Sequence, residues 1–243
     1  MREKKSMNKI IIANWKMYGT VESSKEFLNY ISKNIFNTQT NLVVCLPYTL
    51  LWCAKNYWQA YNKNWLDFGA QNCHYNLQYG PFTGCINAFM LKDIGANYTI
   101  IGHSETRTTP EQNQIYLDNL SAQLQAIFEA RLTPIICVNQ NVWNLQAKHI
   151  TEVDMLINYI GNKKAIIAYE PTWAINQEQA APLTNIQHNI QNLKNKLNLP
   201  VLYGGSVNKQ NANQIAPLCD GLLVGRLGTN QQKFCDLVNN IQS

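Results

Sequence analysis

The carboxyl group of Glu170 is the first candidate for proton-transfer chemistry. It ends the apolar run Ala165-Ile166-Ile167-Ala168-Tyr169, and Pro171 directly after it argues against a helix that starts there. A partly desolvated carboxylate at a strand end can act as a general base, which contributes about 10²–10⁴ in rate. From the sequence pattern alone, Glu170 could instead be a helix N-cap partner, and this alternative to a general base stays open.

A histidine and a lysine follow two other apolar runs and could handle charge. His103 comes after Ile100-Ile101-Gly102, and Ser104 can cap a helix that follows it. At a helix N-terminus the positive dipole end favours the neutral imidazole, which can donate a proton to a developing oxyanion. A structural histidine is the alternative. Lys16 lies between Trp15 and Met17 after the first apolar run, which indicates a site that binds an anion. The alternative is that Lys16 is an ordinary lysine on the solvated surface.

Two glycine-containing segments late in the chain could bind such an anion. Gly204-Gly205-Ser206 follows one apolar run, and Gly225-Arg226 follows the next. Backbone N–H groups in loops near the N-terminus of a short helix attract a phosphate. Either segment alone could be an ordinary turn, but their interval matches the phosphate-binding loops after strands seven and eight of a (β/α)8 barrel.

Eight short apolar runs alternate with amphipathic helical patterns along the chain. Each run is almost continuously apolar, which is typical of parallel strands covered on both faces. Helical periodicity fills the intervals, and the helices after the third and seventh strands are expected to be short. The predicted strands are Ile10–Asn14, Leu42–Cys45, Leu66–Gln71, Tyr98–Ile101, Pro134–Val138, Ala165–Tyr169, Val201–Gly204 and Gly221–Val224.

Eight strand–helix units in 243 residues, roughly 30 residues each, predict an α/β protein with a single (β/α)8 barrel. The barrel domain is expected to span residues 1–243, with residues 1–7 as a flexible N-terminal extension and Met7 as an alternative start. A doubly wound open sheet would place a glycine-rich fingerprint after the first strand, where Asn14-Trp15-Lys16 stands instead. Because the carboxyl ends of barrel strands meet on one face, the candidate residues are expected to converge there.

The composition excludes several classes of protein. With 46% hydrophobic residues and a net charge of +5, the chain is not intrinsically disordered, and no apolar run approaches the ~20 residues that cross a bilayer. The seven cysteines are odd in number and scattered, which predicts reduced thiols in a cytoplasmic protein rather than disulfides or a zinc site. The four histidines lack metal-ligand spacing, so no metal is expected. The basic cluster Arg2, Lys4 and Lys5 is too short for a nucleic-acid arm, so neither nucleic acid nor a membrane is an expected partner.

Beyond these patterns, the sequence resembles the triosephosphate isomerase family over nearly its whole length. A single short match would carry little weight, but the matching segments stand in the family's order along the chain. They are Ala13–Met17, Gly69–Asn72, Phe82–Gly84, Met90–Gly95, Ile101–Glu105, Ala168–Ile175, Tyr203–Val207 and Leu223–Gly225.

The resemblance implies an enzyme of glycolysis and gluconeogenesis that interconverts dihydroxyacetone phosphate and D-glyceraldehyde 3-phosphate through an enediolate. By resemblance, Glu170 is the base that moves a proton between the two substrate carbons, and His103 is the neutral electrophile that polarises the carbonyl. Lys16, helped by Asn14, would hold the substrate and offset the charge of the enediolate. Glu105 resembles the supporting acid beside Lys16. No cofactor is implied.

The resemblance also implies the residues that surround the substrate, and a partner subunit. The implied phosphate-binding positions are Asn176, Gly204, Gly205, Ser206, Gly225 and Arg226. Further supporting positions are Ser104, Trp173 and Tyr203. Thr83 matches the loop tip that enters the neighbouring subunit in the family's dimers, so a homodimer is implied.

Four departures from the family pattern leave Lys16, His103 and Glu170 intact. The lid reads Asn176-Gln177-Glu178-Gln179 where the family usually has Gly-Thr-Gly-Lys. The last loop reads Gly225-Arg226 where the family usually has two glycines, and Gln140 replaces an acid that usually partners the lid tryptophan, here Trp173. Cys85 and Thr106 stand where the family commonly has Glu and Arg. We therefore expect an active isomerase with altered lid behaviour. The alternatives are another phosphate-binding barrel that acts on a sugar phosphate, and a catalytically weakened relative kept as a phosphate-ligand-binding or scaffold protein.

Overall fold

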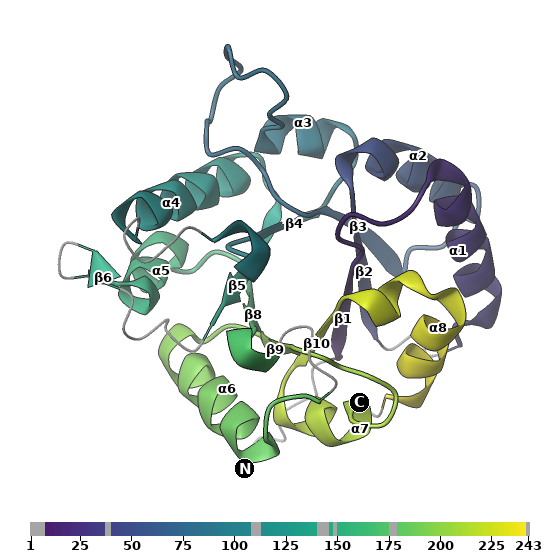
Figure 1. The fold of residues 1–243 in the computed structure, drawn as a ribbon. Helices are drawn as coiled ribbons and strands as arrows, with labels where there is room; N and C mark the ends of the chain where they lie inside the picture. Colours follow the sequence, from purple (N-terminus) through teal and green to yellow (C-terminus); the bar gives the residue numbers. More distant parts are fainter. Residues whose placement is uncertain are drawn as a thin grey trace.

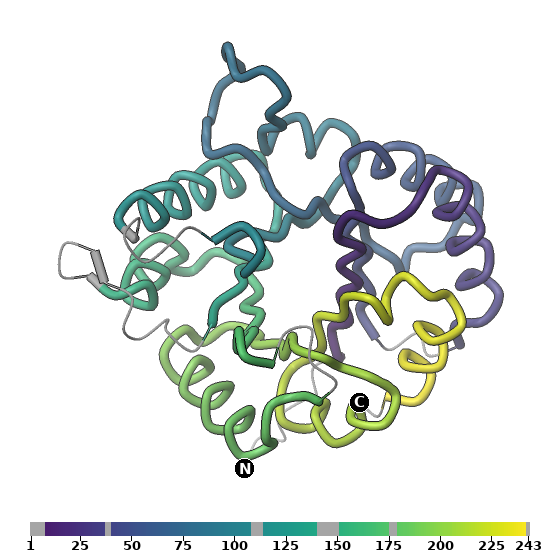
Figure 2. The backbone as a smooth tube through the Cα atoms, in the orientation of Figure 1, coloured from purple at the N-terminus to yellow at the C-terminus, as the bar shows by residue number. Residues whose placement is uncertain are grey.

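The computed structural model describes residues 8–36, 40–107, 113–139, 146–147, 150–174 and 179–241. In this part of the chain, eight parallel strands close into a barrel in the order β1-β10-β9-β8-β5-β4-β3-β2 (Figure 1). The barrel strands are β1 (Ile10–Asn14), β2 (Asn41–Leu46), β3 (Leu66–Ala70), β4 (Tyr98–Ile101), β5 (Thr133–Val138), β8 (Ile166–Tyr169), β9 (Val201–Gly204) and β10 (Gly221–Val224). β1 pairs with both β2 and β10, so the first and last strands of the sequence lie side by side and complete the ring (Figure 2).

The (β/α)8 barrel predicted from the sequence is confirmed. Each predicted strand agrees with an observed strand to within one residue at either end. The two helices expected to be short are α3 (Ala88–Asp93) and α7 (Ala212–Ile215), of six and four residues. A small antiparallel hairpin, β6 (Gln146–Ala147) with β7 (Ile150–Thr151), is not predicted by the sequence pattern, because two-residue strands have no detectable periodicity.

Helices cover the outside of the barrel (Figures 1 and 2). The longer ones are α1 (Val21–Asn34), α2 (Tyr48–Gln59), α4 (Asn113–Glu129), α5 (Glu152–Ile160), α6 (Leu183–Leu197) and α8 (Gln231–Asn240). Three short 3₁₀ helices among the described residues follow the strands β4, β8 and β10: η1 (Ser104–Thr106), η3 (Thr172–Ala174) and η5 (Arg226–Thr229). A fourth, η4 (Ala216–Leu218), directly follows the short helix α7. Among the described residues, no helix combines the length and the apolar character that crossing a bilayer requires.

Two apolar layers explain why the strands are continuous hydrophobic runs. Successive side chains of a strand point to opposite faces. Ile12 of β1 belongs to a cluster made of strand residues inside the barrel, whereas Ile11 and Ala13 pack in the larger cluster between strands and helices. The inner cluster also contains Val43, Cys45, Ile100, Ile135, Cys137, Ile166, Ala168, Leu202 and Leu223. Because both faces of each strand are buried, the candidate chemical residues come where the strands end.

Candidate active site

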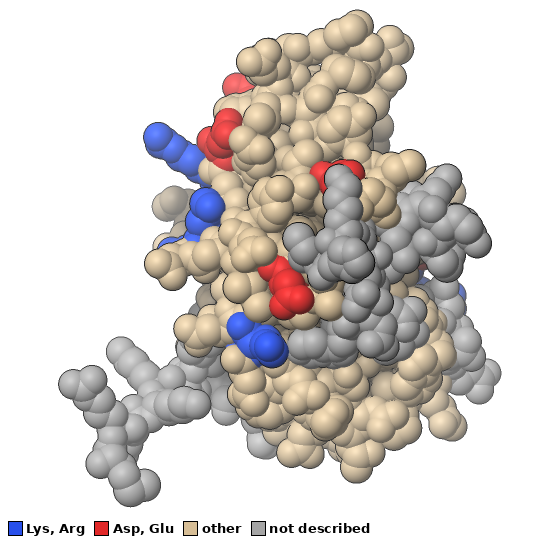
Figure 3. Space-filling view, turned by 90° about the vertical axis from the view of Figure 1, so that its left-hand side faces the viewer, with Lys and Arg blue, Asp and Glu red and all other residues tan. Residues whose placement is uncertain are grey.

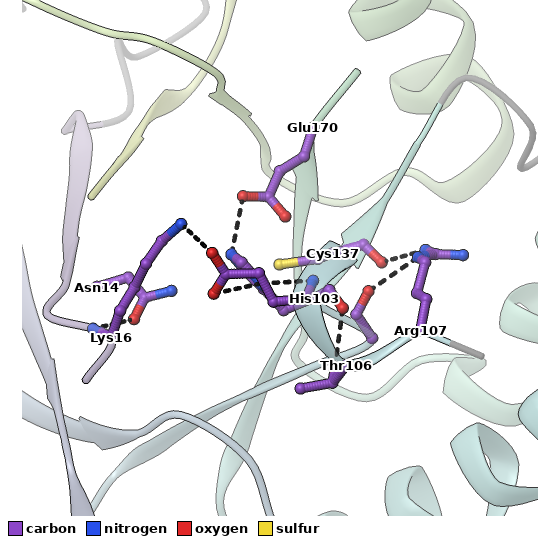
Figure 4. Close-up of polar contacts among 9 residues, drawn as sticks. Asn14, Lys16, His103, Thr106, Arg107, Cys137 and Glu170 are labelled. Carbon is purple, nitrogen blue, oxygen red and sulfur yellow. Dashed lines mark hydrogen bonds and ion pairs between the residues drawn. The ribbon is translucent and has the colours of Figure 1, made fainter. Parts of the chain in front are cut away.

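Lys16, His103 and Glu170 lie together beyond the carboxyl ends of β1, β4 and β8 (Figure 4). His103 Nε2 lies 3.5 Å from Glu170 Oε1, and Lys16 Nζ lies 2.7 Å from Glu105 Oε1. Glu105 also brings its Oε2 to 3.8 Å from His103 Nδ1. The predicted convergence on one barrel face therefore gathers these four side chains into one polar group.

The backbone of η1 determines which nitrogen of His103 carries the proton. The Glu105 amide donates a hydrogen bond to His103 Nδ1 at 3.2 Å. A ring nitrogen that accepts a hydrogen bond carries no proton, so the proton lies on Nε2, which faces Glu170. His103 is only 5% exposed, and Thr106 Oγ1 donates to its carbonyl at 2.9 Å. The site thus presents a fixed, neutral N–H donor.

Glu170 is a buried carboxylate that lies next to the Cys137 thiol. It is 7% exposed, and its Oε2 makes no hydrogen bond to the residues that the structure describes. A Cβ added to Gly204 would lie 2.9 Å from Glu170 Cγ, so the carboxylate occupies space that only glycine leaves open. Cys137 lies beside Glu170 in Figure 4. Burial first, and then the charge of Glu170, raise the pKa of the Cys137 thiol well above its usual value.

Replacing Gly204 by Ala is expected to lower kcat roughly 10–100-fold while the barrel stays folded, because the new methyl group displaces the Glu170 carboxylate and misplacement by about 1 Å can cost ~10²-fold. Steady-state kinetics and circular dichroism measure the two effects. Gly161→Ala is the control for kcat, since a methyl group there meets no atom within 4 Å and lies away from the site, although the φ of +52° at Gly161 makes the substitution cost stability. A kcat for Gly204→Ala equal to that of Gly161→Ala would contradict this role of Gly204.

Lys16 is held by an unusual backbone conformation, with φ at +53°. Its amide donates to the Oδ1 atom of the buried Asn14 at 3.0 Å, which stabilises the turn after β1. A non-glycine residue in this left-handed region costs on the order of 1–3 kcal/mol. The side chain runs past Gly225, where an added Cβ would lie 3.6 Å from Lys16 Cε. The turn therefore directs the ammonium group between Glu105 and the Gly225 segment.

The segments on both sides of residues 175–178 are tied to the loop after β9. Ser206 donates from Oγ to the Ala174 carbonyl at 2.8 Å, and the Ala181 amide donates to the Tyr203 hydroxyl at 3.0 Å. Tyr203 is buried, and burial raises the pKa of its hydroxyl to about 12, so it stays protonated at neutral pH. The predicted residues Asn176 and Gln140 lie outside the described residues.

The remaining predicted residues are distributed around this centre. Gly204, Gly205, Ser206 and Gly225 stand where β9 and β10 end, beside Glu170 and Lys16. Ser104 Oγ is buried and makes no hydrogen bond within the described ranges, whereas Trp173 is half exposed. Arg226 is exposed at the start of η5 and lines a separate hollow. Thr83 is exposed in the loop of residues 71–87, which projects at the top of Figure 1.

A buried ion pair behind His103 is not apparent from the sequence. The Arg107 guanidinium donates to both carboxylate oxygens of Glu152, at 3.0 and 3.2 Å. It also donates to the carbonyls of Gly102, at 3.0 Å, and Cys137, at 2.7 Å. Tyr116 donates its hydroxyl to Glu152 at 3.0 Å, and the guanidinium lies over its ring. Burial is the largest single influence and lowers the pKa of Arg107, but the charge and hydrogen bonds of Glu152, together with Tyr116 and Cys137, raise that pKa above its usual value.

This ion pair lies behind the polar group formed by Lys16, His103, Glu105 and Glu170 and holds two backbone carbonyls next to it. Gly102 directly precedes His103, and Cys137 lies beside Glu170 (Figure 4). The one sequence signal is the place of Arg107 two residues after Glu105, in the segment that follows β4. Glu152 looks like an ordinary acidic residue in the first turn of a helix, and its partner lies 45 residues away along the chain.

The chain is similar to triosephosphate isomerases along nearly its whole length. A family model described as triosephosphate isomerase matches residues 9–241. The triosephosphate isomerase of Aquifex aeolicus (strain VF5) is 33% identical over 251 residues, which cover 96% of this chain and 99% of that protein. That of Alkaliphilus metalliredigens (strain QYMF) is 33% identical, with 95% and 98% covered. That of Buchnera aphidicola subsp. Schizaphis graminum (strain Sg) is 30% identical, with 95% and 96% covered.

Proposed function

Because the chain belongs to the triosephosphate isomerase family, we propose that Glu170, His103 and Lys16 carry out its reaction, the interconversion of dihydroxyacetone phosphate and D-glyceraldehyde 3-phosphate. Family membership makes it an isomerase of triose phosphates, an enzyme of glycolysis. The observation that carries the residue assignment is the 3.5 Å distance between His103 Nε2 and Glu170 Oε1. A proton donor and a base at this distance can act on neighbouring atoms of one small substrate.

Each of the three side chains has a separate task in this proposal. Glu170 takes a proton from the carbon next to the substrate carbonyl and returns it to the former carbonyl carbon. His103 donates its Nε2 hydrogen bond to the carbonyl oxygen, where negative charge develops in the enediolate. Through the same nitrogen it gives a proton to that oxygen and takes one from the neighbouring hydroxyl oxygen, so the old carbonyl becomes a hydroxyl and the old hydroxyl becomes the new carbonyl. The Lys16 ammonium offsets that charge. Burial of Glu170 and His103 strengthens these interactions, because the effective dielectric constant is lower away from water.

The phosphate of the substrate is proposed to bind backbone N–H groups on the neighbouring loops. These are Asn176, Gly204, Gly205, Ser206 and Gly225, and the approach of Lys16 to Gly225 supports this placement. Binding energy from the phosphate, remote from the reacting carbons, can position them for the reaction. The hydrogen bonds that Ser206 and Tyr203 make with Ala174 and Ala181 would hold the described segments on either side of residues 175–178.

The mechanism is tested by running the reaction in D2O with purified protein and a coupled assay. We expect isomerisation of glyceraldehyde 3-phosphate, with deuterium entering the carbon that receives the proton, because a carboxylic acid exchanges its proton with solvent. Mass spectrometry of the product measures the label. No isomerisation would contradict the activity, whereas label entry at an unchanged rate in Glu170→Gln would contradict the role of Glu170.

A second copy of this chain is the partner proposed for the face around the loop of residues 71–87. The loop contains no Asp, Glu, Lys or Arg. Tyr79 is 75% exposed, Tyr75 and Phe82 are also exposed, and Met17 after β1 is 95% exposed. Figure 3 shows that the upper end of the molecule, where the loop projects, carries no charged side chain on this face. Large exposed hydrophobic side chains of this kind mark an interaction surface.

Tyr79→Glu is expected to convert a dimer into a monomer at micromolar concentration, since a carboxylate buried in an apolar interface costs several kcal/mol. Size-exclusion chromatography with light scattering measures the mass. Tyr159→Glu is the control, because Tyr159 is also an exposed tyrosine, at 44%, but lies on α5. A monomeric parent protein, or a Tyr79→Glu variant that remains dimeric, would overturn the proposal that this face, with Thr83 at its tip, forms the dimer.

A cytoplasmic location and a single domain over residues 1–243 complete the proposal. The structure pairs none of the seven cysteines in a disulfide, which suits a reducing compartment.

β1 and β10 come from opposite ends of the chain and pair in one ring, so unfolding is expected in one cooperative transition. Recovery of the protein from a membrane fraction, or two separate unfolding transitions, would contradict these two statements.

A further inference from the structure

A hollow of about 540 Å³ lies between the segment after β9 and the segment after β10, and we refer to it as the basic pocket. Asn208 and Lys209 line it from the first segment. Arg226, Thr229 and Lys233 line it from η5 and the first turn of α8. Its volume falls within the range of roughly 300–1,000 Å³ that is typical of small-molecule sites.

The charges in the basic pocket are one-sided. Lys209, Arg226 and Lys233 are all cations, and among the described residues the one acid that pairs with any of them is Asp236, whose Oδ2 lies 3.3 Å from Lys209 Nζ. Within the described residues, the side chains of Arg226 and Lys233 make neither a hydrogen bond nor an ion pair. Cations gathered from two segments without a matching number of carboxylates repel one another, and an anion relieves that repulsion.

Backbone groups add to this preference for an anion. α8 is ten residues long and begins at Gln231, so its positive end opens at the pocket. Asn230 Oδ1 accepts the Lys233 amide, which leaves the amides of Gln231 and Gln232 without a partner inside the helix. A helix start next to three cations is suited to phosphate oxygens.

The basic pocket is distinct from the substrate site but shares its walls. Val207 and Arg226 line the pocket, and they directly follow Ser206 and Gly225, whose backbones are proposed to hold the substrate phosphate. α7 and α8 lie at the lower right of Figure 1, on the side of the barrel away from the projecting loop of residues 71–87. A second copy bound to that loop would therefore leave the pocket open.

From these observations we propose that the basic pocket binds a small phosphorylated anion in addition to the substrate. Arg226 then has a ligand of its own, which accounts for a cation where the family usually has glycine. Inorganic pyrophosphate is the probe, because it offers phosphate oxygens to all three cations without a particular organic group.

The test is calorimetric titration of pyrophosphate into the enzyme whose active site is first filled with one equivalent of 2-phosphoglycolate per chain. This phosphate-bearing mimic of the enediolate binds the active site tightly, so one equivalent leaves the basic pocket open to pyrophosphate. We expect one pyrophosphate per chain. Arg226→Gln and Lys233→Gln are each expected to weaken its binding at least about tenfold, because each removes a charge-assisted hydrogen bond. Lys233→Gln is expected to leave the isomerase rate unchanged, since Lys233 lies outside the catalytic group.

Lys196→Gln is the matched control, because it removes the same charge from an exposed position on α6, outside the basic pocket. It is expected to bind pyrophosphate as the parent protein does. The proposal is overturned if the enzyme filled with 2-phosphoglycolate binds no pyrophosphate, or if Lys196→Gln weakens binding as much as Lys233→Gln. The latter outcome would mean a response to net charge alone. Loss of isomerase activity plays no part in either outcome, so the proposed mechanism is judged separately.

Discussion

Glu170→Gln is expected to lower kcat at least ~10³-fold, as the loss of a general base should. The amide has nearly the same shape as the carboxylate but cannot take up a proton. The fold should persist, because the substitution removes a buried charge and keeps the contacts with Gly204 and His103. Steady-state kinetics with the coupled assay, together with thermal unfolding, measure the two effects.

A series of variants makes the test of Glu170 sharper. Glu170→Asp keeps the carboxylate but withdraws it by about one bond, so a loss of roughly 10²-fold is expected, smaller than for the amide. Glu26→Gln, an exposed residue in the middle of α1, carries the same chemical change away from the site and should leave kcat unaltered. Full activity of Glu170→Gln would mean that the base is elsewhere in the chain.

Glu152→Gln is expected to destabilise the protein by about 3–5 kcal/mol, because it leaves the Arg107 guanidinium buried without a counter-charge. For a chain of this size that corresponds to a fall in Tm of roughly 6–20 °C. The amide nitrogen of Gln would also face the guanidinium donors that now point at a carboxylate oxygen. Thermal and urea unfolding measure the loss.

Double-mutant analysis separates the ion pair from general disruption of the core. If Glu152 and Arg107 act as a pair, the double variant Glu152→Gln, Arg107→Gln should be less destabilised than the sum of the two single variants. Lys209→Gln, which breaks an exposed ion pair with Asp236, is expected to change stability by less than about 1 kcal/mol. An unchanged Tm for Glu152→Gln would show that the buried pair contributes nothing to the fold.

The fold and the main chemical residues could be predicted because this barrel separates polar and apolar positions along the chain. Strands that are buried on both faces have continuous apolar sequences, so the sequence locates the ends of each strand to within one residue. A polar residue at such an end is conspicuous, as with Lys16, His103 and Glu170. The length of each strand–helix unit then favoured the closed ring over the open sheet.

The supporting contacts could not be predicted, because they join segments that are far apart in the sequence. Glu152 begins α5 and resembles any first-turn acid until the fold places it, fully buried, against Arg107. Tyr203 is the last but one residue of β9, and only the return of the chain at Ala181 gives its hydroxyl a partner. The role of Gly204 depends on the position of the Glu170 side chain on the neighbouring strand.

The sequence by itself determined the order of strands and helices, the closure into a barrel, and the residue types available for proton transfer and anion binding. Only the tertiary structure decided that the His103 proton lies on Nε2, that Glu170 reaches it at 3.5 Å, and that Arg226 lines a second pocket. The physical reason is that local patterns depend on residues a few positions apart. The protonation of His103, the distance between His103 and Glu170, and the pairing of Arg107 with Glu152 depend on distances between strands. Those distances are set only when the ring closes.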